Sequence, residues 1–396
     1  MKILYNHRTR GKGVEGVHIR SIVNALRKLG NEVYVISPPG VDPMNPIAKI
    51  RRKSIINRIW DWISARMPQI GFEILELSYN LFGYWRIRKA FEDHPIDAIY
   101  ERYAFFGWIG TYMAKKKDVP IILEVNEVSG IKRVRKQTLV RLAKAIERKI
   151  FESADGIIVV SNFLKRHIVE KMNIDAEKIY VIPNAVDPEI FDPIYDVEAV
   201  KAELGLRDKV VIGFVGSFVA WNKLDFLLEA FTEISEAAPD AHLLLVGDGP
   251  IRESLEKRIN EEKIKDKVTI TGSVDHAEVP RFIAAMDICV LPHSNEYRSP
   301  VKIFEYMSMV KPVVAPRLEP IEAIIEDGEN GILFDQDDRN SLKECMIRLI
   351  RDKGERDRIA SQARKTVLQN HTWRENAKAI MRIYGTIIAK APDRLG

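Results

Sequence analysis

The chain has 396 residues, more than a single hydrophobic core usually serves, so two domains are expected. Its 46% hydrophobic and 30% charged residues are typical of a folded globular protein and exclude disordered and fibrous classes. The net charge of +5 is modest, so an anionic partner must be argued from clustered charge, and we expect no nucleic-acid partner.

The first predicted elements flank a glycine loop. An apolar strand "KILY" precedes "GKGVEG" at 11–16, and a helix is expected over about 16–29. The literal G-x-G-x-x-G is the pattern of a dinucleotide-binding loop. However, "NHRTR" separates the strand from the loop, and the next strand, "EVYVIS", ends in Ser37 instead of a ribose-binding acid. The sequence therefore disfavours NAD. It predicts instead a flexible loop and a helix start that favour an anion, formed by Gly13, Gly16 and His18.

A basic, aromatic insertion is expected at about 45–92. In residues 47–66 the isoleucines and Trp62 fall near one helical face. The same segment has six basic side chains and only one acid, Asp61. A second aromatic and basic stretch follows at 79–91. Such a helix can lie on anionic lipid, or it can pack on its own domain with a solvated basic face. Both interpretations stay open.

The alternation of short strands and helices continues through the chain and predicts parallel sheets covered on both faces. Strand patterns recur at "DAIY", "PIILEV", "DGIIVVS" and "KIYVIP", then at "VVIGFVG", "AHLLLVGDGP", "KVTITG", "DICVLP" and "PVVAP". The acidic, proline-rich stretch 183–208 is interpreted as a linker. We expect two Rossmann-like doubly wound α/β domains, at 1–190 and 205–370, and a terminal helix at 371–396.

The sequence predicts no membrane span, because its longest near-apolar run, 210–221, is shorter than the ~18 residues a span needs. The start of the chain resembles neither a signal nor a transit peptide. The only two cysteines, Cys289 and Cys345, lie in apolar or helical stretches, which favours a reducing compartment. We therefore expect a cytoplasmic protein.

An ordered series of motifs runs through both halves: "YERYAFFGWIG", "ILEVN", "ADGIIVVSNFLK", "VIPNAVDPEIF", "GFVGSFVAWNKLDFLLEAF", "LLLVGDGPIRESLEK", "VTITGSVDHAEVPRFIAAMDICVLPHS" and "SPVKIFEYMSMVKPVVAP". This series resembles the group 1 (family 4) retaining glycosyltransferases. The resemblance implies the GT-B fold, in which two Rossmann-like domains face each other across a cleft. It also implies that the nucleotide sugar lies against the second domain, that the first supplies the acceptor side, and that the terminal helix crosses back to the first.

The resemblance assigns donor contacts in the second domain. Glu305 matches the glutamate that holds the ribose hydroxyls, a role suited to a carboxylate that accepts two hydrogen bonds. The partner glutamate lies one residue out of register, so either Glu296 or Tyr297 occupies that position. The remaining expected donor contacts are these: Arg298, Ser299, Gly216, Ser217, Gly272, Ser273 and Val274.

Cations are needed for the diphosphate, since the leaving group gains negative charge as the glycosidic bond breaks. Lys223 matches the family lysine, whereas Ser217 stands where an arginine is usual. Lys302, in "SPVKIFE", is expected to restore the missing charge, with Arg298 nearby. On the acceptor side Asn126 replaces the usual histidine; it can donate to a hydroxyl but cannot act as a general base.

The sequence thus predicts a glycosyltransferase that moves a sugar from a nucleotide-diphosphate donor, UDP- or GDP-linked, to a hydroxyl acceptor of a glycan or lipid. No metal motif is present, so no essential metal or other cofactor is expected. A nucleotide-sugar epimerase and a catalytically silent sugar-binding subunit share this architecture and stay as alternatives.

Overall fold

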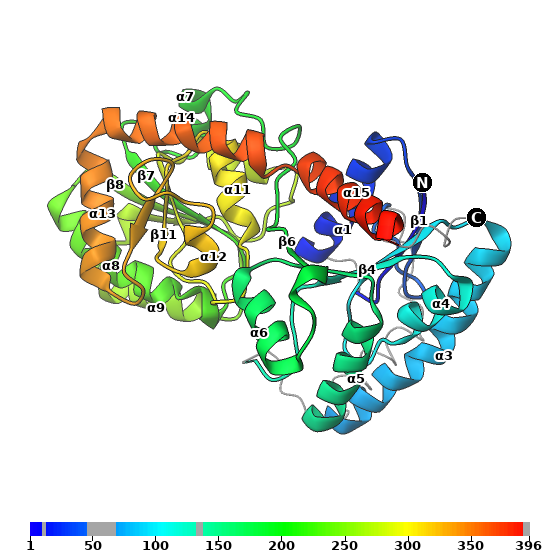
Figure 1. The fold of residues 1–396 in the computed structure, drawn as a ribbon. Helices are drawn as coiled ribbons and strands as arrows, with labels where there is room; N and C mark the ends of the chain where they lie inside the picture. The colour runs from blue at the N-terminus through cyan, green and yellow to red at the C-terminus, as the bar shows by residue number, and fades with distance from the viewer. Residues whose placement is uncertain (10–12, 46–68, 132–137, 391–396) are drawn as a thin grey trace. The chain divides into compact units, whose positions relative to one another are not determined.

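The computed structural model describes residues 1–9, 13–45, 69–131 and 138–390. The chain forms two compact units, one of Met1–Ile182 with Trp373–Gly396 and one of Pro183–Thr372. Each contains one parallel sheet flanked by helices (Figure 1). The predicted fold class, two doubly wound α/β domains, is confirmed.

The first unit is built on a six-stranded sheet in the order β2-β1-β3-β4-β5-β6. All its neighbouring strands are parallel. β4 is buried along its whole length, as expected of a strand covered on both faces. The strands are β1 (Lys2–Asn6), β2 (Glu32–Ile36), β3 (Ala98–Arg102), β4 (Ile121–Val125), β5 (Gly156–Val159) and β6 (Ile179–Val181).

Six α-helices surround this sheet in the described residues (Figure 1). They are α1 (Gly13–Lys28), α3 (Gln69–Asp93), α4 (Ile109–Lys117), α5 (Val140–Ser153), α6 (Asn162–Met172) and α15 (Trp373–Lys390). The helix expected from about residue 16 thus begins at Gly13. The basic segment 47–66 and the glycine-loop residues 10–12 lie outside the described residues.

Helix α15 joins the first unit although it is last in the sequence. The Tyr384 hydroxyl donates to the Ile99 carbonyl of β3 over 2.7 Å, and α15 packs against α1. Helical spacing in the sequence predicts one apolar face, made of Ala377, Ile380, Met381, Tyr384, Ile387 and Ile388. The structure buries most of these residues, with Ile383 buried and Met381 only half-buried. Its helical spacing therefore predicted the packing surface but not the partner.

The second unit has a six-stranded parallel sheet in the order β12-β11-β10-β7-β8-β9. Its strands are β7 (Val210–Val215), β8 (Ala241–Val246), β9 (Val268–Ile270), β10 (Ile288–Val290), β11 (Val313–Pro316) and β12 (Ile332–Phe334). The short β12 was not among the predicted strands. The flanking α-helices are α7 (Val197–Glu203), α8 (Leu224–Ala237), α9 (Arg252–Glu261), α10 (Val279–Ala284), α11 (Val301–Ser308), α12 (Glu319–Glu322), α13 (Arg339–Arg351) and α14 (Lys353–Asn370).

The stretch 183–208, expected as a linker, belongs to the second unit. Phe191, Val200 and Leu206 are buried in its core, and Lys201 pairs with Asp287 over 2.7 Å. The boundary between the units therefore falls at residue 182, because these apolar side chains are scattered among acids and prolines yet still reach a core.

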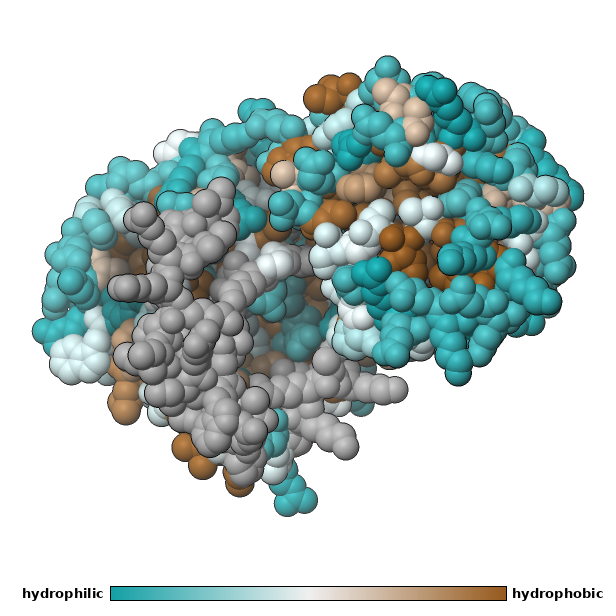
Figure 2. All heavy atoms as spheres, turned by 180° about the vertical axis from the view of Figure 1, so that it is seen from behind, coloured by the Kyte–Doolittle hydropathy of each residue, from teal (hydrophilic) through white to brown (hydrophobic). Residues whose placement is uncertain are grey.

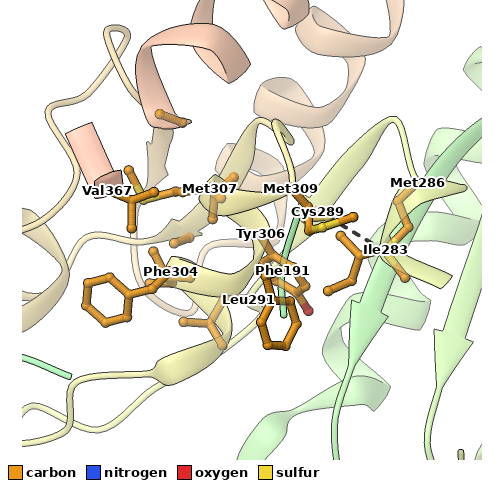
Figure 3. Close-up of a cluster of buried hydrophobic side chains, with 14 of the residues drawn as sticks. Phe191, Ile283, Met286, Cys289, Leu291, Phe304, Tyr306, Met307, Met309 and Val367 are labelled. Atoms are coloured by element: carbon orange, nitrogen blue, oxygen red, sulfur yellow. Dashed lines mark hydrogen bonds between the residues drawn. The ribbon is translucent and has the colours of Figure 1, made fainter. Parts of the chain in front are cut away.

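Two hydrophobic clusters cover the two faces of the second sheet, since alternate residues of β8 belong to different clusters. One of them holds α11 in place (Figure 3). Phe304, Tyr306 and Met307 of α11 lie in it beside Phe191 and Val367. This packing fixes the helix that carries two of the predicted donor-binding residues.

No helix of the described residues is long and apolar enough to span a bilayer.

Candidate active site

The carboxyl edge of the second sheet is lined by glycines. Gly216 follows β7, Gly247 follows β8 and Gly272 follows β9. Gly247 and Gly272 form an isolated antiparallel bridge. A Cβ on Gly247 would lie 2.0 Å from the Gly216 carbonyl oxygen, so no side chain fits there. The loops therefore approach each other through their backbones, the arrangement that lets main-chain groups contact a ligand.

Lys302, in the first turn of α11, lies against this edge. Its ammonium is 4.0 Å from the centroid of the Phe214 ring. A Cβ on Gly216 would stand 2.8 Å from the Lys302 Nζ, which locates the ammonium at the glycine of the β7 loop. Within the described ranges this Nζ donates no hydrogen bond. Burial lowers the pKa of Lys302 to about 8.

Lys302 is only half-buried, but an ammonium that donates no hydrogen bond within the described residues is available to a ligand. At the carboxyl edge of a parallel sheet and at the start of a helix, an anion is the ligand that meets this need. The position of Lys302 is therefore compatible with its expected role as a cation that binds the diphosphate.

Glu305 lies one turn after Lys302 on the same helix. Its side chain is 12% exposed, and a carboxylate oxygen lies 3.8 Å from the His276 Nε2. The next residue anchors the helix, because the buried Tyr306 hydroxyl accepts a hydrogen bond from the Val215 amide at the end of β7, over 2.8 Å. Lys302 and Glu305 are thus held by a rigid element beside the glycine edge.

The loop before α11 is tied to the start of the second unit. The Asn184 amide nitrogen donates to the Ser299 hydroxyl over 3.0 Å, and the Asn184 side chain donates to the Ser299 carbonyl over 2.6 Å. Arg298 lies over the Tyr297 ring, whereas Glu296 is exposed and Tyr297 is buried. Ser299 is therefore a buried loop anchor, while Glu296 is open to solvent.

Lys223 has a different environment from Lys302. It adopts a left-handed backbone conformation at the start of α8 and pairs with Asp337 over 2.5 Å. The neighbouring Trp221 carbonyl is hydrogen-bonded to the His293 ring. Ser217, where an arginine was expected from the resemblance, is exposed. Lys223 therefore needs to leave Asp337 before it can neutralise a ligand.

The expected donor contacts Gly272, Ser273 and Val274 follow β9. Ser273 is exposed, and Val274 packs against the core cluster beneath α11. Arg252 pairs with Asp248, and its guanidinium lies 3.3 Å from the position of a Cβ on Gly272. Main-chain groups of this segment thus lie at the same glycine edge as Lys302.

In the first unit, charged side chains at the carboxyl edge bind one another. Asn126 donates to the Glu124 carboxylate over 2.8 Å, and Arg102 pairs with the same carboxylate over 2.6 Å. The Tyr100 hydroxyl donates to Glu124 over 3.1 Å. Glu101 accepts a hydrogen bond from the Asn6 side chain over 2.6 Å.

The glycine loop contributes two glycines to α1, the exposed Gly13 with φ of +61° and the buried Gly16. His18, one turn on, is buried. Its Nδ1 lies 2.9 Å from the Arg102 guanidinium, and its ring meets Trp373 edge-on. Burial lowers the pKa of His18 to about 4, so the ring is neutral at pH 7 and adds no positive charge for an anion.

Sequence reasoning missed three of these contacts: the Asn184 clamp, the Lys223–Asp337 pair and the Arg102–Glu124 pair. The first two join residues more than 100 positions apart. Asn184 stands in the quoted motif "VIPNAVDPEIF", but no local pattern shows its partner. Arg102 ends β3 and Glu124 lies opposite it in the neighbouring strand β4. Pairing of these two consecutive strands is the signal that could have found this contact.

Two α/β units with parallel sheets, and a glycine-lined edge with a half-buried lysine, are the architecture of the two-domain glycosyltransferase class. The family described as Glycosyltransferase Family 4 matches residues 13–190, and the one described as Glycosyl transferases group 1 matches residues 209–352. The two matches together account for most of the chain. The chain belongs to the group 1 (family 4) glycosyltransferases and is an enzyme of that kind.

Curated relatives span most of the chain. The alpha-monoglucosyldiacylglycerol synthase of Acholeplasma laidlawii is 25% identical and covers 82% of both chains. The alpha-D-kanosaminyltransferase of Streptomyces kanamyceticus is 28% identical over 66% of this chain and 68% of its own length. The D-inositol 3-phosphate glycosyltransferase of Xylanimonas cellulosilytica is 23% identical over 98% and 94%.

Solved structures share the fold. HepE of Anabaena, crystallised with UDP, matches with a TM-score of 0.73 at 17% identity, over 98% of this chain and 100% of HepE. A sucrose-phosphate synthase from Thermosynechococcus elongatus matches with a TM-score of 0.72 at 19% identity, over 99% and 100%. These likenesses establish the GT-B fold.

Proposed function

We propose that the protein is a retaining glycosyltransferase that moves a sugar from a nucleotide-diphosphate sugar to a hydroxyl acceptor in glycan or glycolipid synthesis. The observation that carries this proposal is the Lys302 ammonium, held without a hydrogen bond from Nζ to the described residues, against the Gly216 backbone. A diphosphate supplies the anion that this position lacks.

The residues of the second unit take the following roles. Lys302 and main-chain groups of Gly216 and Ser217 bind the diphosphate, and Glu305 accepts hydrogen bonds from the ribose hydroxyls. Lys223, once released from Asp337, adds a second cation. Arg298, Ser299 and Glu296 border the sugar, and Gly272, Ser273 and Val274 meet the base.

The reaction step balances without an enzyme nucleophile. The bond between the sugar C1 and the leaving phosphate oxygen breaks, and a bond from C1 to the acceptor oxygen forms on the same face. The acceptor proton passes to the leaving phosphate, and Lys302 stabilises the charge that develops there. Asn126 replaces a base-capable histidine, so a route that uses the leaving group as base fits this chain.

Relatives and structural neighbours support the substrate classes. HepE was also solved with UDP-glucose, which favours a UDP-linked donor for this chain. A GDP-linked donor is the other option to test. The names of the relatives mention a diacylglycerol product and an inositol phosphate. The acceptor is therefore proposed only as a hydroxyl of a glycan or lipid, and Asn126 as a donor to it.

The site of action is proposed as the cytoplasm, at the inner face of the cell membrane. The basic segment 47–66 motivates this proposal from the sequence alone, since it lies outside the described residues. Changing Arg51, Arg52 and Lys53 to serine should weaken flotation with anionic vesicles. An unaltered protein that never floats would remove the membrane part and leave the transferase proposal intact.

The decisive assay incubates the protein with UDP- and GDP-sugars, with and without diacylglycerol or inositol 3-phosphate. Acceptor-dependent release of nucleoside diphosphate, with the donor's anomeric configuration kept in the product, supports the proposal. Epimerised sugar without an acceptor would support the epimerase instead.

Lys302→Ala and Glu305→Ala should each greatly reduce transfer while keeping the fold. EDTA should leave the rate unchanged, because no step is assigned to a metal.

A further inference from the structure

A histidine of the second unit faces the expected ribose-binding carboxylate from a neighbouring loop. Hydrophilic side chains, drawn in teal, cover most of the coloured surface in Figure 2, so exposure alone does not distinguish His276, which is 40% exposed. Its neighbour distinguishes it. The His276 Nε2 lies 3.8 Å from a carboxylate oxygen of Glu305, whose side chain is only 12% exposed. His276 therefore reaches Glu305 from an element other than α11.

The loop that carries His276, between β9 and α10, is fixed at both ends. At its start, Gly272 forms the isolated bridge with Gly247. At its end, the His276 carbonyl accepts a hydrogen bond from the Val279 amide, the first residue of α10, over 3.3 Å. Between them, Val274 packs against the core cluster that holds α11. The loop therefore presents residue 276 at a defined place beside that helix.

The ring of His276 is positioned by Phe191. The two rings meet edge-on, with their centroids 5.7 Å apart. Phe191 is buried in the core cluster (Figure 3), and its carbonyl accepts a hydrogen bond from the Ser308 hydroxyl of α11 over 2.7 Å. Helix α11 thus carries Glu305 and, through Ser308, also holds the residue against which His276 packs. The tertiary fold, and not the spacing in the sequence, brings His276 to Glu305.

Both side chains keep their hydrogen-bonding capacity for a third group. Within the described part of the chain, neither the Glu305 carboxylate nor the His276 ring takes part in a hydrogen bond. Their separation of 3.8 Å is too long for a direct hydrogen bond between them. A hydroxyl within reach of both can donate its proton to the carboxylate and accept one from an imidazole N–H. The pair therefore suits a hydroxyl-bearing ligand.

We propose that His276 is a further donor-binding residue, which contacts a ribose hydroxyl of the nucleotide together with Glu305. The hydroxyl donates to the Glu305 carboxylate and accepts from His276, in the tautomer that carries the proton on Nε2. This inference rests on the proposed function, in which Glu305 binds the ribose, and adds a residue that the sequence did not single out. A nucleotide without the hydroxyl leaves both groups without a partner, so the pair selects ribonucleotides.

The test uses isothermal titration calorimetry of the full chain with UDP and GDP, and with the 2′,3′-dideoxy analogue of whichever binds more tightly. His276→Phe keeps an aromatic ring against Phe191 but removes both ring nitrogens. It should weaken binding of the ribonucleotide about tenfold and leave the affinity for the dideoxy analogue unchanged. The preference for the ribonucleotide should therefore fall from about a hundredfold in the unaltered protein to about tenfold in the variant. A merely structural role would weaken both nucleotides alike.

The matched control is His371→Phe, the same substitution at a histidine whose ring centroid lies 5.2 Å from that of Phe304 on α11. It should bind both nucleotides like the unaltered protein. The role of His276 is overturned if His276→Phe weakens both nucleotides equally, or keeps the full preference for the ribonucleotide. In either case the unaltered protein still prefers the ribonucleotide, and the proposed donor site stands. An unaltered protein that binds both alike would instead remove the ribose contact of Glu305, and the role of His276 with it.

Discussion

The carboxyl edges of the two sheets differ in what their charged groups contact. In the second unit the edge is lined by glycines, and the Lys302 ammonium donates no hydrogen bond within the described residues. In the first unit Glu124 accepts from Arg102, Asn126 and Tyr100 at once. One edge holds an ammonium that donates no hydrogen bond to the described residues, as the proposed anionic ligand requires, whereas the charged groups of the other edge already bind one another.

The largest expected effect is on stability in the first unit. Glu124→Gln leaves the Arg102 guanidinium buried without its counter-charge, which should lower the free energy of unfolding by about 3–5 kcal/mol. Lys302→Met should keep or raise stability at neutral pH, because burial disfavours the charged lysine. Urea unfolding followed by circular dichroism measures both. Glu152→Gln, which breaks the exposed Arg148–Glu152 pair, is the control and should cost less than about 1 kcal/mol.

The next effect is on ligand affinity in the second unit. Lys302→Met should weaken UDP or GDP binding about a hundredfold, because a charge-assisted contact with the diphosphate is lost. Isothermal titration calorimetry measures it. Lys343→Met, which removes a lysine paired with Glu233 on the surface of the same unit, should bind like the unaltered protein. Equal loss in both variants would contradict the assignment.

A smaller effect separates the role of Glu305 from general electrostatics. If its carboxylate holds the ribose, the unaltered protein should bind a 2′-deoxy nucleotide about tenfold more weakly than the ribonucleotide. Glu305→Gln should bind the two with nearly equal affinity. A variant that still prefers the ribonucleotide tenfold would show that another group reads the sugar.

The smallest effect is a pH dependence. The pKa of Lys302 is lowered to about 8, so the ammonium is present below that value and is lost as the pH rises through it. Nucleotide affinity should therefore fall roughly fourfold between about pH 7 and about pH 8.5. Lys302→Arg keeps its charge over this range and should show a flat profile. A profile as steep as that of the unaltered protein would assign the titration to another group.

The fold was largely predictable because strand and helix periodicities alternate along the chain. The exceptions have local causes. β12 is only three residues long, and Phe191, Val200 and Leu206 are spaced irregularly among prolines and acids, so no period reveals that they are buried. The face of α15 was predicted from spacing, but its place in the first unit came from the resemblance alone.

The candidate site was predictable where a motif carries it. Lys302 and Glu305 share one helix, and a helix of eight residues keeps them a turn apart whatever the rest of the chain does. The ion pair of Lys223 with Asp337 and the neutral, buried ring of His18 depend on residues brought together by the tertiary fold. No local pattern could show that Lys223 has a counter-charge or that His18 lacks a charge.

The most direct test asks which edge holds the nucleotide. Hydrogen–deuterium exchange of the full chain, with and without saturating UDP or GDP, reports protection along the backbone. We predict protection at 213–218, 247–249, 272–274 and 299–305, the segments at the glycine edge of the second unit, and its loss in Lys302→Met at the same nucleotide concentration. Protection confined to 98–103 and 121–127 of the first unit would contradict the account.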